Sequence, residues 1–185
     1  HYNVVSAFIK SMRGSDPDAA VYWLMRLVEA GEDPLFLLRR MIIFASEDVG
    51  NADPRALVVV TSADAAFRRL GMPEGLYPLT HACLYLSVAP KSGAVGKAFS
   101  QARELIERLG ALPVPKKLRN PVTKLARSEG HGDGYRYAHD FDQGFVPGET
   151  YLPDDLVGTT LYAPTSHGEE AKIDARLRAM RNQSK

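Results

Sequence analysis

The sequence predicts an all-α fold, in which an array of helical hairpins is followed by an extended segment and a C-terminal helix. Three observations carry this prediction. Asp-Pro pairs recur in the first part of the chain, a glycine follows each of them at a helical distance, and the apolar residues between have helical spacing. Beyond residue 110 this pattern stops, and Gly, Pro, Tyr and Phe become frequent.

The Asp-Pro pairs are predicted helix starts. They are Asp16-Pro17, Asp33-Pro34 and Asp53-Pro54. An aspartate before the first turn accepts hydrogen bonds from free backbone N–H groups, and its charge complements the helix dipole. A proline at the first helical position has no N–H to leave unpaired. Glycine suits the left-handed position after a helix. The corresponding glycines are Gly31, Gly50 and Gly71.

The spacing of apolar residues supports helices between these marks. In the first unit they are Ala20, Trp23, Leu24, Leu27 and Val28. A β-branched run over residues 58–61 is less favourable to the third helix. The connections are short, so we expect neighbouring helices to pack antiparallel.

The remaining elements are less regular. Residues 78–89 and 94–109 are predicted helices that end at Pro90 and Gly110. Residues 111–167 contain aromatic side chains that a disordered linker would lack, so we expect this segment to pack over the helices, with a short helix over 122–127. A last helix is predicted over 169–180, and the final residues should fray. The expected domains are residues 1–110, the helical array, and residues 111–185, packed on it.

The composition is that of a globular protein, with 45% hydrophobic and 24% charged residues. The net charge of +1 gives no global attraction to nucleic acid or membrane, so a basic site would be a local patch. Cys83 is the single cysteine, which excludes an internal disulfide and fits a cytoplasmic protein. No apolar run is long enough to span a membrane. Because the chain begins at His1, we expect it to be part of a larger protein.

Three patterns suggest chemistry, and each has a simpler structural explanation. The segment Lys91–Ala98 resembles a phosphate-binding loop but lacks its first glycine and its magnesium-binding hydroxyl. His and Asp residues cluster over 131–142 without the spacing of a tight metal site, and turn formation accounts for them equally well. His81 and Cys83 point to different faces of a helix, so we expect a core histidine rather than a nucleophile pair. We therefore predict no catalytic, cofactor-binding or metal-binding residue in this chain.

Charge patterning singles out two sites. One is a basic stretch without acidic residues, a candidate DNA-binding site formed by Lys116, Lys117, Arg119, Lys124 and Arg127. The other is Glu47 with Asp48, acids at a predicted helix C-terminus, where negative charge opposes the dipole. We expect arginines to pair with them, either Arg39, Arg40 and Arg55 or those of another subunit.

Several motifs, taken in order, resemble one known family. They are residues 1–24, Gly31-Glu-Asp-Pro34, residues 45–54, Ala89-Pro-Lys-Ser92, residues 118–125, Tyr137-Ala-His-Asp140 and Tyr151-Leu-Pro153. Together they resemble the C-terminal region of the RarA/MgsA family of AAA+ ATPases, whose eukaryotic relative is the Werner helicase-interacting protein. Met25, Met41 and Ile43 depart from the expected pattern by apolar exchanges only.

The resemblance implies a function for the parent protein. It implies a clamp-loader-like ATPase that maintains replication forks and acts in recombination and repair, with ATP and magnesium bound in an AAA+ module outside this chain. It also implies that residues 1–110 form a collar-like oligomerisation domain, which holds subunits together, typically as a homotetramer. DNA and single-stranded DNA-binding protein are the other implied partners. Direct DNA contact by the basic stretch is the alternative. Residues expected to be structural or interfacial are Asp16, Trp23, Asp33, Glu47, Asp48 and Asp53.

Overall fold

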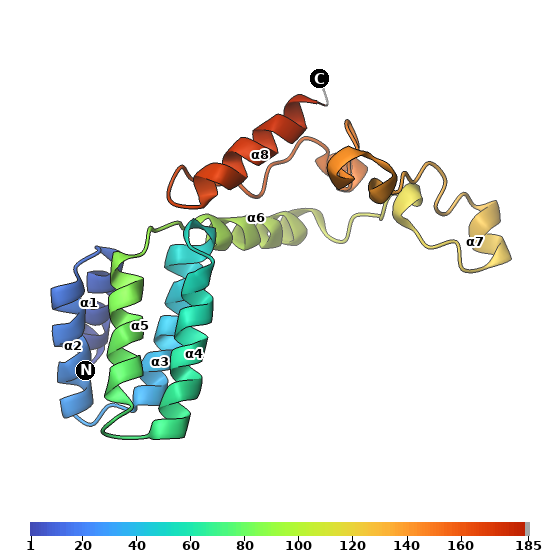
Figure 1. The fold of residues 1–185 in the computed structure, drawn as a ribbon. Helices are drawn as coiled ribbons and strands as arrows, with labels where there is room; N and C mark the ends of the chain where they lie inside the picture. Colours follow the sequence, from blue (N-terminus) through green and yellow to red (C-terminus); the bar gives the residue numbers. More distant parts are fainter. Residues whose placement is uncertain (184–185) are drawn as a thin grey trace. The chain divides into compact units, whose positions relative to one another are not determined.

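The computed structural model describes residues 1–183 and confirms the all-α prediction, because this range holds helices and connecting segments but no strand (Figure 1). The α-helices are α1 (Tyr2–Arg13), α2 (Pro17–Glu29), α3 (Pro34–Phe44), α4 (Arg55–Leu70), α5 (Leu76–Val88), α6 (Ala94–Leu109), α7 (Lys124–Ser128) and α8 (Glu170–Asn182). No helix in residues 1–183 combines the length and apolar character needed to cross a bilayer.

The contacts divide the chain into two compact units. Unit 1 comprises His1–Ala98 and Tyr162–Ile173, and unit 2 comprises Phe99–Leu161 and the chain from Asp174 onward. Residues 162–173 thus group with the N-terminal helices, whereas the sequence assigned them to the second domain. The division at residue 110 into two functional domains stays a prediction.

Unit 1 is a bundle with α5 at its centre. α5 packs against α1, α2, α3 and α4, and further contacts join α1 to α2 and α3 to α4 (Figure 1). Two pairs of consecutive helices, α1 with α2 and α4 with α5, therefore pack together as the expected hairpins. The expected packing of α2 against α3 is not among the major contacts, since the major partners of α2 are α1 and α5.

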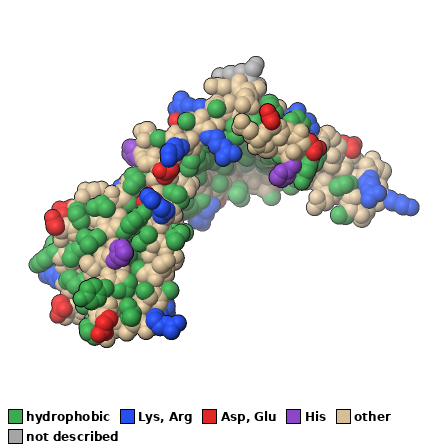
Figure 2. Space-filling view, viewed as in Figure 1, with side chains coloured by type: hydrophobic (Ala, Val, Ile, Leu, Met, Phe, Trp, Pro, Cys, Tyr) green, Lys and Arg blue, Asp and Glu red, His purple; other side chains and the backbone are tan. Residues whose placement is uncertain are grey.

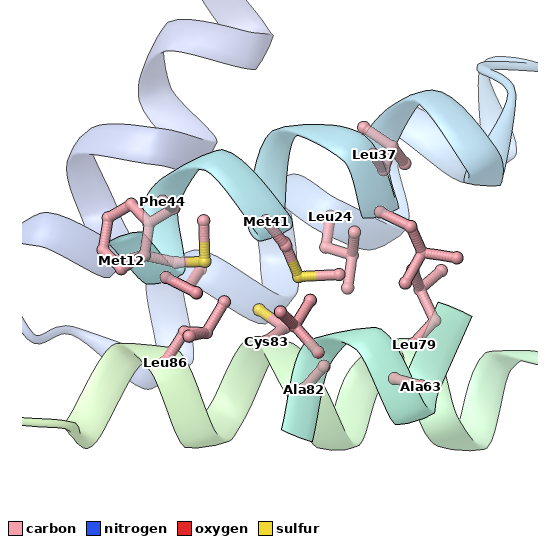
Figure 3. Packing of buried hydrophobic residues seen from close by; sticks show 14 of the residues in the cluster. Met12, Leu24, Leu37, Met41, Phe44, Ala63, Leu79, Ala82, Cys83 and Leu86 are labelled. Atoms are coloured by element: carbon pink, nitrogen blue, oxygen red, sulfur yellow. The ribbon is translucent and has the colours of Figure 1, made fainter. Parts of the chain in front are cut away.

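The core of unit 1 is continuous and draws on all five helices. Figure 3 shows side chains from facing helices interdigitating, and they include Met12, Leu24, Met41, Phe44 and Leu86, each at most 1% exposed. Each such side chain contributes about 1.5–3 kcal/mol by its removal from water. Cys83 is fully buried here, and burial raises the pKa of its thiol to about 12. It is the small core residue that the sequence predicted.

Two of the three predicted helix starts have the expected capping geometry. The carboxylate of Asp16 accepts a hydrogen bond from the backbone N of Ala19 at 2.9 Å, and that of Asp33 accepts one from Leu35 at 2.9 Å. Gly31 has a φ of +86°, the left-handed conformation expected after α2. The third helix begins one residue later than predicted, because Pro54 is its N-cap and α4 starts at Arg55, and Asp53 has additional partners described below.

The second predicted helix changes geometry before it reaches Gly50. α3 ends at Phe44 and continues as a π-helical turn, η1 (Ala45–Val49), and a 3₁₀ turn, η2 (Gly50–Ala52). Single π-turns are rare and frequently mark functional positions. The β-branched run 58–61 lies inside α4, so packing outweighs its weak helix propensity there.

The later helices lie close to their predicted positions. α5 begins at Leu76, two residues before Pro78, because a proline is tolerated in the first turn, where backbone N–H groups have no helical partner. α6 has the predicted bounds, and α7 begins after Thr123, whose side chain accepts from the backbone N of Ala126 at 3.0 Å. α8 extends to Asn182. The predicted fraying falls partly on residues 184–185, outside the described residues.

Unit 2 has little regular structure beyond parts of α6 and α8. Its connecting segment contains α7 and the 3₁₀ turns η3 (Lys116–Leu118), η4 (Ala138–Asp140), η5 (Asp142–Gly144) and η6 (Asp154–Leu156). Among its described residues, the buried apolar ones are Ala126 and Val146. The extended character of this segment is as predicted.

Candidate functional site

A buried carboxylate anchors the returning chain within unit 1. Glu170, the first residue of α8, is 0% exposed. Its Oε2 accepts from the Tyr162 hydroxyl at 2.7 Å, its Oε1 from Thr165 Oγ1 at 3.0 Å, and Ser92 hydrogen-bonds it as well. Burial alone would raise the pKa of Glu170, but these hydrogen bonds outweigh it and lower the pKa. The carboxylate is therefore ionised and holds segments that are distant in sequence.

Backbone contacts reinforce this polar junction. The backbone N of Glu169 donates to the carbonyl of Ala52 at 2.8 Å, and His167 Nδ1 lies 2.8 Å from the carbonyl oxygen of Lys91. A Cβ on Gly168 would lie 2.3 Å from the Ala52 oxygen, so only glycine permits this approach. Residues 162–173 are thus fixed to the turn before α4 and to the loop after α5.

Asp53 joins α4 to α5. It is 5% exposed and accepts from Tyr85 Oη at 2.5 Å, from the backbone N of Arg55 at 3.1 Å and from Arg55 Nε at 3.0 Å. Burial opposes ionisation, but the hydrogen bonds from Tyr85 and Arg55 lower the pKa of Asp53. Its geometry is that of a structural carboxylate with an interhelical partner.

The prediction that an arginine pairs with Glu47 and Asp48 is confirmed for Asp48, but the arginine is none of the three named from the sequence. Pairing with arginines of another subunit stays a prediction. Arg13 of α1 binds Asp48, with Nε at 2.6 Å from Oδ1 and Nη2 at 3.3 Å from Oδ2. Of the arginines named from the sequence, Arg55 binds Asp53 instead. Asp48 lies in the π-helical turn, which directs its carboxylate toward the end of α1, and Glu47 is exposed beside it.

Trp23 lies on α2, half-buried against the core of unit 1. Its ring meets that of Tyr22 edge to face, with centroids 5.0 Å apart, and the Arg26 guanidinium stacks 5.2 Å from its centroid. With the capping residues Asp16 and Asp33, it stabilises unit 1 locally. Its expected role in an interface stays a prediction.

The segment that resembles a phosphate loop is part of the junction. Lys91 Nζ donates to the carbonyls of Ser87 and Ala89 and to Ser15 Oγ, at 3.0, 2.5 and 3.2 Å, so it closes the C-terminal end of α5. Burial lowers the pKa of Lys91. The Ser92 hydroxyl accepts from Ala94 and bonds Glu170. Lys91 and Ser92 thus have bonding partners within unit 1.

The basic stretch lies in unit 2 and is partly neutralised. Lys117 forms a close ion pair with Glu149, whose other oxygen accepts from Arg136 Nε at 3.2 Å. Bonding by Lys117, with Thr150 N–H and Arg136, lowers the pKa of Glu149 to about 2. Arg119 and Arg127 donate to backbone carbonyls, those of Val114 and Pro121 respectively. Lys116 and Lys124 are exposed, and no side-chain bond to another described residue engages them.

The His/Asp cluster does not converge. His131 Nε2 lies 3.7 Å from Glu129, His139 contacts the ring of Tyr137, and within residues 1–183 no three His, Cys, Asp or Glu side chains assemble as metal ligands. Asp140 and Asp142 belong to 3₁₀ turns. The structure thus places two of the cluster's aspartates in turns, as the simpler explanation expects.

The outward face of α5 is apolar. Its exposed side chains, spaced four, three and four residues apart, are Tyr77 (81% exposed), His81, Leu84 (42%) and Val88 (66%). A groove of about 840 Å³ runs along Tyr77, His81 and Leu84. Figure 2 shows hydrophobic side chains gathered over the α5 region of unit 1. The prediction that His81 is a core residue was wrong, because it belongs to this exposed stripe, which we call the α5 stripe.

Sequence reasoning missed the three residues that organise the polar contacts. Glu170 and Glu149 look like ordinary surface acids in the sequence, and Arg13 stands at the end of a helix, next to Gly14. A partial signal existed for Glu170, since an acid in the first turn of a helix is favourable to the dipole. Nothing in the local sequence shows that its partners come from residues 92 and 162–165.

These features define an all-helical domain in which polar side chains tie helices together and one helix presents an apolar face. Comparison with known proteins identifies the family of this domain. The chain belongs to the family described as MgsA AAA+ ATPase C terminal, whose model matches residues 14–181.

Named relatives agree with the family. The chain is 47% identical over 184 residues to Replication-associated recombination protein A of Haemophilus influenzae, covering 100% of this chain and 41% of that protein. It is 48% identical over 176 residues to the protein of that name in Coxiella burnetii, covering 95% and 40%. ATPase WRNIP1 of Dictyostelium discoideum is 39% identical over 155 residues, which is 84% of this chain and 18% of that protein. The chain thus spans about two-fifths of the length of the two bacterial relatives.

Proposed function

We propose that this chain is the oligomerisation region of a clamp-loader-like AAA+ ATPase that acts at replication forks and in recombination and repair. Membership of an AAA+ ATPase C-terminal family and the names of the relatives support the parent's role. In this proposal ATP and magnesium bind elsewhere in the parent, the chain itself is not an enzyme, and the assembly is a cytoplasmic homotetramer. Contact with single-stranded DNA-binding protein belongs to the same proposal and rests on the family resemblance.

The apolar character of α5 on every side carries the proposal. α1, α2, α3 and α4 cover its inner sides, where Leu79, Ala82, Cys83 and Leu86 are buried. A helix that is apolar all round is expected to be covered all round. The α5 stripe is nonetheless exposed, and its alternating four- and three-residue spacing is that of helix-on-helix packing. A second copy of the chain is the proposed cover.

The solution mass of the 185-residue chain tests this. Light scattering at micromolar concentration should give an oligomer, and Leu84→Glu with Val88→Glu should give a monomer, because charges would be buried in the contact. Ile43→Glu, at a 48% exposed position on α3, is the matched control and should keep the oligomer. A monomeric 185-residue chain without substitutions, or a double variant that assembles normally, would overturn the proposal.

DNA contact by unit 2 is the second candidate, and the exposed Lys116 and Lys124 favour it. Each phosphate contact steepens the fall of affinity with salt by a slope of about 0.7–0.9 on logarithmic axes. Lys116→Glu with Lys124→Glu should therefore weaken DNA binding and flatten that slope. Lys97→Glu on α6 is the control. Lys117 is left intact, because its reversal would break the ion pair with Glu149. An unchanged slope would contradict this function.

A further inference from the structure

A basic cleft lies between α1 and α3 in unit 1. It has a volume of about 410 Å³, and its walls include three cations, Lys10, Arg13 and Arg40, and the apolar side chains of Val5, Ile9 and Phe36. Clefts of this size commonly hold a small ligand or one unit of a polymer. The residues come from helices that the core fixes, since Phe8, Met12, Leu37 and Leu38 are fully buried beside them.

Arg40 has an unpaired buried donor. Its Nε is shielded from solvent without a hydrogen-bond partner, and no ion pair joins the side chain to another described residue. A guanidinium is always charged, and a buried donor without an acceptor is destabilising. Most buried polar groups in native proteins have a hydrogen-bond partner, so an unpaired one suggests that its acceptor is a bound molecule. Arg40 also lines the cleft, so a rotation of its side chain would bring this shielded donor to an acceptor bound there.

The acidic side chains near the cleft do not neutralise its cations, so the cleft is suited to bind an anion. Asp48 binds Arg13, Glu47 is exposed beside that pair, and Glu32 binds His1 at 2.9 Å. No such contact within the described chain engages Lys10. Lys10 and Arg40 are thus two cations without acidic partners on the two facing helices.

We propose that this α1–α3 cleft binds the phosphates of a nucleic-acid strand through Arg40 and Lys10. The Nε edge of a guanidinium matches two phosphate oxygens, and a lysine adds a point charge. The apolar wall formed by Val5, Ile9 and Phe36 offers a surface for a base, and base stacking on aromatic rings is the usual complement to phosphate contacts on single strands. A carboxylate of an acidic peptide would use the cations but leave this wall unoccupied. The site is independent of the proposed self-association.

Fluorescence anisotropy with a labelled oligothymidylate of about twelve nucleotides tests the assignment on the 185-residue chain. Arg40→Gln and Lys10→Gln should each weaken binding at least about tenfold, the effect of losing one charge-assisted hydrogen bond. Arg69→Gln and Lys97→Gln remove the same charges elsewhere and should leave affinity unchanged. The Arg40 Nε–H signal in nitrogen-correlated NMR, assigned by its loss in Arg40→Gln, should shift on adding the strand.

Four outcomes would overturn the assignment. The first is binding that survives both cleft variants but is lost in Lys116→Glu with Lys124→Glu, which would place the strand on unit 2. The second is equal affinity for thymidine monophosphate, which would indicate a free nucleotide. The third is competition by oligoglutamate but not by inorganic phosphate, which would indicate a peptide carboxylate. The last is a lower melting temperature for Arg40→Gln with unchanged affinity, which would make Arg40 structural. Oligomeric mass, measured on the same samples, reports separately on self-association.

Discussion

Units 1 and 2 of this chain are held together by different means. Unit 1 has a continuous apolar core supplied by five helices, and polar contacts such as Glu170 with Tyr162 are added at its edge. Unit 2 buries Ala126 and Val146, while α6 exposes Phe99, Ile106 and Leu109. Its fixed points are the ion pairs of Glu149 and a series of short turns.

The difference indicates which unit is stable by itself. Ordering each residue costs about 1–2 kcal/mol of backbone entropy, and buried apolar surface is the main compensation. Unit 1 has that compensation in its core. Unit 2 has ten large apolar side chains exposed along 99–161, and a surface of this kind is expected to be covered in an assembly. The comparison therefore predicts strong effects of mutation in unit 1 and local effects in unit 2.

The largest expected effect is a difference in stability loss between a core variant of unit 1 and a matched variant of unit 2. Phe44→Ala should lower the free energy of unfolding by about 3–5 kcal/mol, because the ring is 1% exposed and its loss leaves a cavity. Phe99→Ala, at a position that is 57% exposed in unit 2, is the matched change. Urea unfolding of the two variants checks this. Equal losses would show that the two units are equally packed.

A second variant tests the polar junction. Glu170→Gln should cost about 2–3 kcal/mol, because Tyr162, Thr165 and Ser92 all donate to its charged oxygens. Glu169→Gln, at the adjacent exposed position, should cost almost nothing. Thermal unfolding measures both. If the two variants are equally stable, the buried carboxylate does not hold residues 162–173 in place.

In unit 2 the expected effect is local and depends on pH. The folded pKa of Glu149, about 2, is below its ordinary value of 4.5. Its contribution to stability is therefore full above about pH 4.5 and is lost as the pH falls toward 2. Hydrogen exchange around Lys117, Arg136 and Thr150 should accelerate over that window, and Glu149→Gln should show the fast exchange already at neutral pH. Exchange of the unit 1 core is the internal control, and acceleration there at the same pH would contradict a local role.

The smallest effect is expected at the π-helical turn. Asp48→Asn should cost about 0.5–1 kcal/mol, because Arg13 keeps a hydrogen-bond partner but loses an ion pair that is partly exposed. Glu47→Gln should be neutral. Chemical denaturation resolves the difference, and a larger loss for Glu47→Gln would reverse the assignment of the two acids.

Several helices were predictable because their signals are local. Asp16 and Asp33 cap helices within three residues of themselves, and the bounds of α6 follow from its own apolar spacing and Gly110. The family was recognisable from motifs in order, and its model match confirms it. The α5 stripe was hidden, because the sequence does not say which side of a helix that is apolar all round stays uncovered.

Contacts between distant segments were not predictable. Arg13 and Asp48 are far apart in sequence, and the π-helical turn that directs Asp48 toward Arg13 has no propensity signal. The same holds for Lys117 with Glu149, where a lysine counted toward a DNA site proved to have an acidic partner. Charge runs show which residues are present, while the fold decides which of them remain available.

The close approach of Gly168 to Ala52 has a consequence for the order of events during synthesis. More than a hundred residues separate these two positions, and ribosomes add roughly 5–20 residues per second. The helices of unit 1 emerge and can collapse on their core several seconds before residues 162–173 leave the ribosome. During that interval the turn at Ala52 and the hydroxyl of Ser92 are open to water. A nascent chain arrested in this interval should contain the core without its C-terminal closure.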